Sequence, residues 1–373
     1  MLGRIQDWSF KYCKYDISAL SFYSYALDWI FYISMLVVFI LYGTIIPPRY
    51  QEFSLQDISL MYSYKTEDET VIPIFLLILI AIVFPALQFV VCSFYNRRTL
   101  SGARQAWDVF VGLMCLCGSM ATQLMITCIL KNICGLPRPD LISRCEPFIG
   151  TLPPTPPPAF PPNGLVTVDV CTNDNIFILQ EGFRSFPSGH SSTVFCGMVI
   201  SSLNISGKLQ VFDKRGISFK VILAIFPIMV ACFVSCTRIS DNRHFLRDVI
   251  GGSIIGTTVA VWFYLQYFPG VFHLENAGRA YPPRRIGVAN FFNNVGGFWA
   301  LEERLPGAFE ERVLNTSTVI TSLNDIDEAP SEHLMDPEEL MDIPRNIEFF
   351  NKLGNRLKNT FLDLNHNKNI LPA

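Results

Sequence analysis

The sequence predicts an all-α fold, in which a six-span transmembrane helical bundle is followed by a largely disordered cytoplasmic C-terminal tail. Three observations predict this fold. Half of the 373 residues are hydrophobic and only 16% are charged, which is too apolar for an ordinary soluble domain and normal for a multi-span membrane protein. Six segments approach the roughly 20 apolar residues that a helix needs to cross a bilayer. After the last of them the chain turns polar, with an acidic stretch at 325–342.

The predicted spans are residues 29–46, 71–95, 109–130, 191–205, 219–236 and 249–268. The fourth is short and carries serines and Gly197, but its position between two polar loops supports it. Six crossings put both termini on one side. We therefore expect a cytoplasmic N-terminus at 1–28, a six-span domain at 29–268 and a cytoplasmic tail at 269–373.

Lysine and arginine predict the orientation, because they are retained on the cytoplasmic side. They concentrate in the N-terminus, the second loop, the fourth loop and the start of the tail. The first and third loops are therefore predicted to be luminal or extracellular. The fifth loop departs from the pattern, since Arg238, Arg243 and Arg247 crowd a short stretch on the predicted luminal side. Arginines on the side of the membrane that the topology rule disfavours indicate a functional role.

The third loop, residues 131–190, contains a proline-rich run at 153–162 that favours an extended conformation and is expected to be a spacer. Cys145 and Cys171 lie in this loop, and we expect them to pair if it faces an oxidising lumen. In the tail, a terminal helix is predicted at 347–364, either lying on the membrane surface or packing on the membrane domain. Its apolar face would comprise Phe350, Leu353, Leu357, Phe361 and Leu364.

Charge and processing signals narrow the class of protein further. A net charge of −3 argues against a nucleic-acid binder, which would need a concentrated basic face. The first residues lack the apolar core and cleavage site of a secretory signal, so the first span is expected to be an uncleaved anchor. The sequons at Asn204 and Asn315 fall at or beyond predicted cytoplasmic ends, and we expect neither to carry a glycan.

Three polar clusters lie at the predicted luminal ends of the third, fourth and sixth spans. They read KNICGLPRP at 131–139, PSGH at 187–190 and RISDNRHFLRD at 238–248. Of the five histidines, only His190 and His244 precede the polar tail region, and each belongs to one of these clusters. Folding a six-span bundle is expected to bring the three clusters together.

The first cluster has the residues for binding phosphate. Gly135 and the prolines end the third span, and Arg138 is held between two prolines. The planar guanidinium group of Arg138 can bind two phosphate oxygens at once, while Lys131 supplies a point charge from the last helical turn. By itself, this cluster is explained better by two residues that anchor a helix at the headgroup boundary.

The second cluster reads as a helix start. Ser188 is a candidate N-cap, and Gly189 allows an oxyanion to approach the positive helix end closely. His190, in the first turn, has the chemistry to donate a proton to a leaving oxygen. An ordinary capped helix with an interfacial histidine remains an alternative for this cluster alone.

The third cluster pairs His244 with Asp248 four residues later, on one helical face if the sixth helix has begun by then. Asp248 would then hold one ring nitrogen and leave the other as a nucleophile. Such a pair is also a common structural hydrogen bond. Arg238 favours the catalytic interpretation, because neighbouring cations disfavour protonation of a histidine.

Together, K-x6-R-P, P-S-G-H and R-x5-H-x3-D, in this order, resemble the type 2 phosphatidic acid phosphatase (PAP2) family, also called lipid phosphate phosphatases. The resemblance implies that His244 attacks phosphorus and forms a phosphohistidine, that Asp248 orients it and that His190 protonates the leaving alcohol. It implies no metal or other cofactor. The usual serine before the arginine is Thr237 here, which retains a hydroxyl. The implied phosphate-binding residues are Lys131, Arg138, Ser188, Gly189 and Arg238.

The amino-acid sequence around the motifs is most similar to that of the fungal diacylglycerol pyrophosphate phosphatases. This similarity implies a phospholipid substrate within the bilayer: phosphatidate, diacylglycerol pyrophosphate or lysophosphatidate. It implies an active site on the luminal or extracellular face of a vacuolar, Golgi, endoplasmic reticulum or plasma membrane. Two alternatives stay open: a lipid phosphotransferase of the same superfamily, and a noncatalytic membrane scaffold that keeps the fold.

Overall fold

The computed structural model describes residues 9–12, 15–95, 102–147, 164–272, 277–281 and 283–284. The proline-rich run, the sequon at Asn315 and the predicted tail helix lie outside these residues. The described residues belong to one compact unit, Met1–Glu310. They are mainly helical, with loops between the helices, isolated bridges and a short antiparallel hairpin of β1 (Ser9–Tyr12) and β2 (Tyr15–Ser18), which the sequence analysis does not anticipate.

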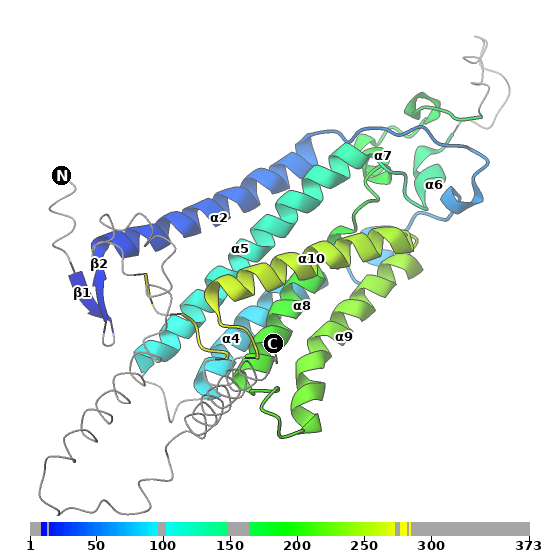
Figure 1. Ribbon diagram of the computed structural model, residues 1–373. Helices are drawn as coiled ribbons and strands as arrows, with labels where there is room; N and C mark the ends of the chain where they lie inside the picture. Colours follow the sequence, from blue (N-terminus) through cyan, green and yellow to red (C-terminus); the bar gives the residue numbers. More distant parts are fainter. Residues whose placement is uncertain are drawn as a thin grey trace, which may run out of the picture. The chain divides into compact units, whose positions relative to one another are not determined.

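Six long helical segments follow the hairpin in the described part of the chain, each overlapping one predicted span. They are α2 (Ala19–Ile45), the continuous α3 (Ile74–Ile78), η3 (Leu79–Val83) and α4 (Phe84–Tyr95), α5 (Gly102–Cys134), α8 (Gly189–Lys208), α9 (Ser218–Ser240) and α10 (Leu246–Tyr267). Shorter helices lie in the loops: η1 (Ile58–Leu60), η2 (Glu67–Glu69), α6 (Leu141–Cys145), η4 (Val168–Val170) and α7 (Ile176–Gly182). Figure 1 shows α2 beside α5, and α8 beside α9 and α10.

Five of these helical segments are long and apolar enough to cross a membrane: Ser21–Ile45, Ile74–Ser93, Gln105–Cys134, Ser218–Ser240 and Leu246–Tyr267. The chain is therefore an integral membrane protein. The predicted fourth span, α8, is not among the five, so the count of six spans stays a prediction. Its sequence is rich in serine, and the helix packs against α3, η3, α4, α5, α9 and α10. Its serines contact protein rather than lipid, as where Thr127 Oγ1 donates to Ser192 Oγ at 3.1 Å.

Two helices begin earlier than the sequence predicts. The first starts at Ala19 rather than at residue 29, and the third starts at Gly102 rather than at residue 109. In both cases an aspartate interrupts the apolar run but is neutralised by a distant residue. Asp28 Oδ2 lies 2.6 Å from Arg284 Nη2, and Asp108 Oδ2 lies 2.9 Å from Lys208 Nζ. Because each aspartate is paired, its charge does not end the helix, although it interrupts the apolar run from which the span was predicted.

Glycines bring the inner helices into backbone contact. A Cβ on Gly197 of α8 would lie 1.9 Å from Ala81 O. Pro85, four residues after Ala81, has no N–H to bond that carbonyl within its own helix, and the π-helical turn η3 lies at this point. A Cβ on Gly256 of α10 would lie 2.2 Å from Ser192 O. These contacts fix the N-terminus of α8 beside the start of α10.

A second, smaller core lies at one end of the bundle, beneath the loops that carry α6 and α7 (Figure 1). We call residues 47–73, 135–147 and 164–188 the loop layer. Phe53 and Val166 join its parts through paired backbone hydrogen bonds of 3.0 and 2.8 Å. Cys145 and Cys171 form a disulfide within it. The core of the loop layer comprises Phe53, Leu60, Leu141, Cys145, Val166 and Phe183.

Candidate active site

The structure brings the three polar clusters together where the loop layer meets the bundle. Ser188 of the second cluster donates its backbone N–H to Asp248 O of the third at 3.0 Å. Ser185, just before the second cluster, donates its backbone N–H to Leu136 O of the first at 3.1 Å. His244 lies within electrostatic range of Arg138, Lys131 and His190. Every sequence-predicted site residue therefore lies in one region.

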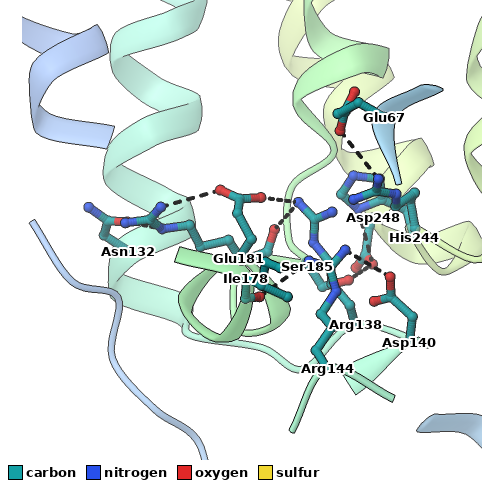
Figure 2. A network of polar contacts seen from close by, with 12 residues as sticks. Glu67, Asn132, Arg138, Asp140, Arg144, Ile178, Glu181, Ser185, His244 and Asp248 are labelled. Atoms are coloured by element: carbon teal, nitrogen blue, oxygen red, sulfur yellow. Dashed lines mark hydrogen bonds and ion pairs between the residues drawn. The ribbon is translucent and has the colours of Figure 1, made fainter. Parts of the chain in front are cut away.

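In the first cluster, α5 ends because Gly135 adopts a left-handed conformation with φ of +58°. A side chain could not fit there, since a Cβ would lie 1.9 Å from Arg49 O. The chain then turns and presents Arg138, whose Nη2 donates to Glu181 Oε2 at 2.7 Å (Figure 2). Arg138 Nε is buried and has no hydrogen-bond partner among the described residues. The guanidinium thus retains a buried donor that no described residue binds.

Lys131 and Gly189 come together from α5 and α8. Lys131 Nζ lies only 3.5 Å from where a Cβ on Gly189 would stand. The ammonium group therefore lies beside the first turn of α8. Among the residues that the structure describes, no side chain forms a hydrogen bond or ion pair with Lys131. A cation and a positive helix end converge at this point without a fixed counter-ion.

Glu181 is a site residue that the sequence analysis missed. Its two oxygens bind Arg138 at 2.7 Å and Arg184 at 3.3 Å. Burial raises the pKa of Glu181, but the positive charges of Arg138, Lys131 and Arg184 outweigh that effect and lower the pKa to about 2. Glu181 is therefore an anion throughout the physiological range. It supplies part of the negative charge that balances this cationic region.

The second cluster starts α8 as predicted. Ser188 is the N-cap residue, and its Oγ accepts hydrogen bonds from Ser191 N at 3.4 Å and from Ser191 Oγ at 3.1 Å. The Phe186–Pro187 peptide bond before it is cis. His190 lies in the first turn, and its Nε2 atom is buried without a hydrogen-bond partner in the described part of the chain. An imidazole with an uncommitted nitrogen therefore stands at the positive end of a helix.

The third cluster differs from the sequence-based expectation in one respect. His244 precedes α10, which begins at Leu246, so it does not share a helical face with Asp248. His244 Nδ1 and Asp248 Oδ2 are 3.9 Å apart, which is too long for a hydrogen bond. Asp248 Oδ2 instead accepts a hydrogen bond from Ser185 Oγ at 2.6 Å (Figure 2). It also accepts one from Phe245 N at 3.0 Å. The carboxylate lies beside the imidazole, and these two donors hold it there.

His244 is 3% exposed and surrounded by positive charge. Burial lowers the pKa of His244 well below its ordinary value, and the charges of Arg138 and Lys131 lower it further. The imidazole is therefore neutral at physiological pH, with an electron pair available on one nitrogen. Nδ1 has no hydrogen-bond partner among the described residues.

Two arginines of the third cluster complete the cationic surroundings. Arg238, in the last turn of α9, is 2% exposed, and its Nη2 donates to Asp241 Oδ2 at 2.9 Å. Arg243 Nη2 donates to Lys65 O at 2.6 Å and lies 3.3 Å from Glu67 Oε1. Both arginines act electrostatically on His190. Buried arginines of this number suit the binding of a multiply charged anion.

Four functional neighbours escape motif reasoning: Glu181, Arg184, Ser185 and Asp241. Ser185 and Arg184 stand just before the second cluster, but nothing in their spacing shows which residue they bind. Asp241 lies three residues after Arg238, a helical spacing that could have indicated an ion pair. Glu181 has the same three-residue spacing to Arg184, but nothing in the sequence indicates its contact with the first cluster. Its partner Arg138 is 43 positions away.

Metal-ligating side chains do not gather at the site. Among the described residues, no three histidine, cysteine, aspartate or glutamate side chains are grouped as they would be around a metal ion. The groups that converge are cations, two imidazoles and a helix N-terminus. Such a set can bind a phosphoryl group, attack it with one imidazole and exchange a proton through the other.

Comparison with known proteins agrees with this chemistry. The family model of the PAP2 superfamily matches residues 112–271, which contain all three clusters. Lipid phosphate phosphatase 2 of Arabidopsis thaliana is 35% identical over 243 residues, covering 65% of this chain and 77% of the relative. Probable diacylglycerol pyrophosphate phosphatase 1 of Schizosaccharomyces pombe is 31% identical over 255 residues, covering 68% and 84%.

A third relative, diacylglycerol pyrophosphate phosphatase 1 of Saccharomyces cerevisiae, is 29% identical over 227 residues, covering 60% of this chain and 73% of the relative. No solved structure matches the chain. The first two relatives are similar over more than two thirds of their own length, and the family model spans the residues that form the site. On these grounds, the chain belongs to the PAP2 superfamily.

Proposed function

We propose that this protein is a lipid phosphate phosphatase that works without a metal ion, through a phosphohistidine intermediate. The observation that carries the proposal is the pair of imidazoles, His190 at a helix N-terminus and His244 beside a buried carboxylate, among buried arginines. A neutral substrate would not need such surroundings. The names of the relatives, which include lipid phosphate and diacylglycerol pyrophosphate phosphatases, support the assignment.

In the proposed first step, His244 attacks phosphorus. Because Asp248 lies on the Nδ1 side, at 3.9 Å, we assign the attack to Nε2. A P–N bond forms while the P–O bond to the lipid alcohol breaks, and His190 donates a proton to the departing oxygen. The incoming phosphate brings negative charge beside His190, which favours the protonated form that this step requires.

In the second step, His190 accepts a proton from water, whose oxygen attacks phosphorus. The P–N bond breaks and inorganic phosphate leaves. The residues proposed to bind the phosphoryl oxygens in both steps donate through cationic side chains, a hydroxyl or the helix N-terminus, and they stabilise charge that grows in the transition state. They are Lys131, Arg138, Ser188, Gly189 and Arg238.

The proposed substrates are phosphatidate, diacylglycerol pyrophosphate and lysophosphatidate. All three end in a phosphoryl group, and the pyrophosphate lipid needs no additional residue, because its inner phosphate is itself the leaving group. Substrate would reach the site from the bilayer, since long apolar helices surround it.

We further propose that α8 is the fourth of six spans and that residues 29–268 form the catalytic domain, with both termini cytoplasmic. The site would then face the lumen or the cell exterior. The Cys145–Cys171 disulfide supports this side, because disulfides persist in oxidising compartments. A vacuolar, Golgi, endoplasmic reticulum or plasma membrane would satisfy this orientation.

The test uses the full-length protein purified in detergent and assayed with phosphatidate without added metal. We expect His244→Ala to abolish phosphate release and to remove an acid-labile phosphoenzyme, while the amount of membrane-inserted protein is unchanged. His333→Ala, the same change in the tail, is the matched control and should retain full activity. Full activity of His244→Ala would contradict the mechanism. Recovery of the phosphoryl group on an added alcohol, instead of as free phosphate, would favour a phosphotransferase.

A further inference from the structure

The first loop contacts the first cluster directly. Tyr62 donates its backbone N–H to Pro139 O at 3.1 Å, and Tyr64 donates its backbone N–H to Ser143 Oγ at 3.1 Å. These bonds join residues about 80 positions apart in the sequence. We call first-loop residues 62–71 the brace. One side of the brace is thus fixed to the segment that presents Arg138.

The same segment also contacts the third cluster. Arg243 Nη2 donates to Lys65 O at 2.6 Å. The guanidinium groups of Arg144 and Arg243 both lie over the ring of Tyr64, at 4.2 and 5.2 Å from its centroid. Cations over an aromatic face are attracted to it, so the ring links the two clusters. The brace therefore ties the segment after α5 to the segment before α10.

Asp241 is the strongest of these links. Its carboxylate is completely buried and is bound on both oxygens. Oδ1 accepts from Lys65 Nζ at 3.2 Å, while Oδ2 accepts from Val71 N at 3.1 Å and from Arg238 Nη2 at 2.9 Å. A buried carboxylate is stable only when charges and donors surround it. Two of these three donors belong to the brace.

Arg238 depends on this carboxylate for its orientation. The guanidinium is 2% exposed, and its Nε and Nη2 atoms contact only Thr237 Oγ1, at 3.4 Å, and Asp241 among the described side chains. The Asp241 contact is the shorter one and the one between opposite charges. A guanidinium fork binds phosphate well only when its plane is held in the correct direction.

We propose that Asp241 is a positioning residue, which the brace holds through Lys65 and the Val71 amide so that Arg238 faces the phosphoryl group. The inference rests on the proposed function, in which Arg238 binds phosphate. It assigns the first loop a part in catalysis that its polar, acidic sequence does not suggest. Asp241 itself need not touch the substrate.

The main test compares wild-type protein with Asp241→Asn, which keeps the shape of the side chain and removes its charge. Binding of inorganic vanadate, a phosphate mimic, is measured by titration calorimetry on the full-length protein in detergent, and KM and kcat are measured with phosphatidate. We expect the Kd for vanadate to rise about tenfold, equivalent to about 1.4 kcal/mol, and KM to rise with it, because Arg238 loses the charged partner that orients it.

Lys65→Met provides a second variant on a partly exposed partner, and it should raise the Kd for vanadate about threefold. The matched control is Asp213→Asn, which removes a similar aspartate–lysine pair, 2.6 Å from Lys220 Nζ, and should leave binding unchanged. If both site variants bind vanadate as wild type does and differ only in thermal stability, Asp241 is merely structural and the proposal is wrong. Tight vanadate binding without phosphate release from any lipid would instead contradict the proposed function.

Discussion

At the scale of single residues, the two histidines differ in what surrounds them. His244 lies 3.9 Å from a buried carboxylate, and Ser185 and the Phe245 amide hold that carboxylate in place. Among the described residues, no carboxylate forms an ion pair with His190, which stands at a helix N-terminus among arginines. A nucleophile gains from a nearby anion that stabilises the imidazolium-like intermediate, whereas an acid need only reach the leaving oxygen.

The assignment of His190 as the acid leads to a leaving-group test. We expect His190→Gln to slow phosphate release from phosphatidate by about 10²–10⁴-fold, because the alkoxide leaves without a proton. Release from p-nitrophenyl phosphate, whose leaving group is stable as an anion, should fall far less. Steady-state kinetics with both substrates measures the ratio. An equal loss on the two substrates would show that His190 serves structure or binding rather than proton donation.

Glu181 predicts a pH dependence of stability. Its pKa in the folded protein is about 2, below the value of 4.5 for a free glutamate, so its contribution is fully present above pH 4.5. The contribution is lost as the pH falls towards 2. We therefore expect Glu181→Gln to lower Tm at pH 6, and the difference from wild type to shrink below pH 4.5. Glu338→Gln, the same change in the tail, is the control, and a difference that stays constant with pH would refute the assignment.

At the scale of elements, the sequence predicts where the helices lie better than where they begin. Apolar runs identify all six helices, but Asp28 and Asp108 interrupt two of those runs, so these two helices are predicted to begin too late in the sequence. Their partners, Arg284 and Lys208, are 256 and 100 positions away, and no local pattern shows that the charges will be neutralised. A serine-rich helix such as α8 is likewise a weak candidate for a membrane span when only its sequence is considered, because its packing partners are not known from the sequence.

Helix contact through glycine gives a prediction at this scale. In Gly256→Val, Cβ would lie 2.2 Å from Ser192 O, so α8 and α10 must separate. We expect a loss of about 1–3 kcal/mol, measured as a lower Tm in detergent, together with reduced phosphate release as the two histidines move apart. Ile254→Val changes an exposed position of the same helix and is the control. Wild-type stability of the glycine variant would show that the close approach is not needed.

At the scale of the whole molecule, the loop layer and the bundle have separate cores, and the site lies where they meet. Of the proposed phosphate binders, Lys131, Gly189 and Arg238 lie at helix ends of the bundle, whereas Arg138 and Ser188 belong to the loop layer. The proposed luminal or extracellular orientation of this junction rests on the distribution of lysine and arginine, and the disulfide supports the proposal.

A new glycosylation sequon tests the orientation. Leu165→Ser completes a sequon at Asn163 in the third loop. Expressed in a eukaryotic cell, this variant should gain mass that glycosidase treatment removes, because only luminal or extracellular segments receive glycans. The natural sequon at Asn204 serves as the internal control, since Asn204 is completely buried in α8 and should stay unmodified. An unmodified variant, or a glycan on Asn204, would overturn the proposed topology.

The sequence by itself determined the fold class, the positions of the helices and the three clusters that carry the histidines and cations, because each is written within a short stretch of chain. Only the tertiary structure decided that α8 is interior, that Asp248 is held by Ser185, that Glu181 balances Arg138 and that Asp241 ties Arg238 to the first loop. These contacts join residues in separate elements, from 43 to 176 positions apart where different motifs meet. Periodicity and spacing report local geometry, whereas the partner of a buried charge depends on how the whole chain packs.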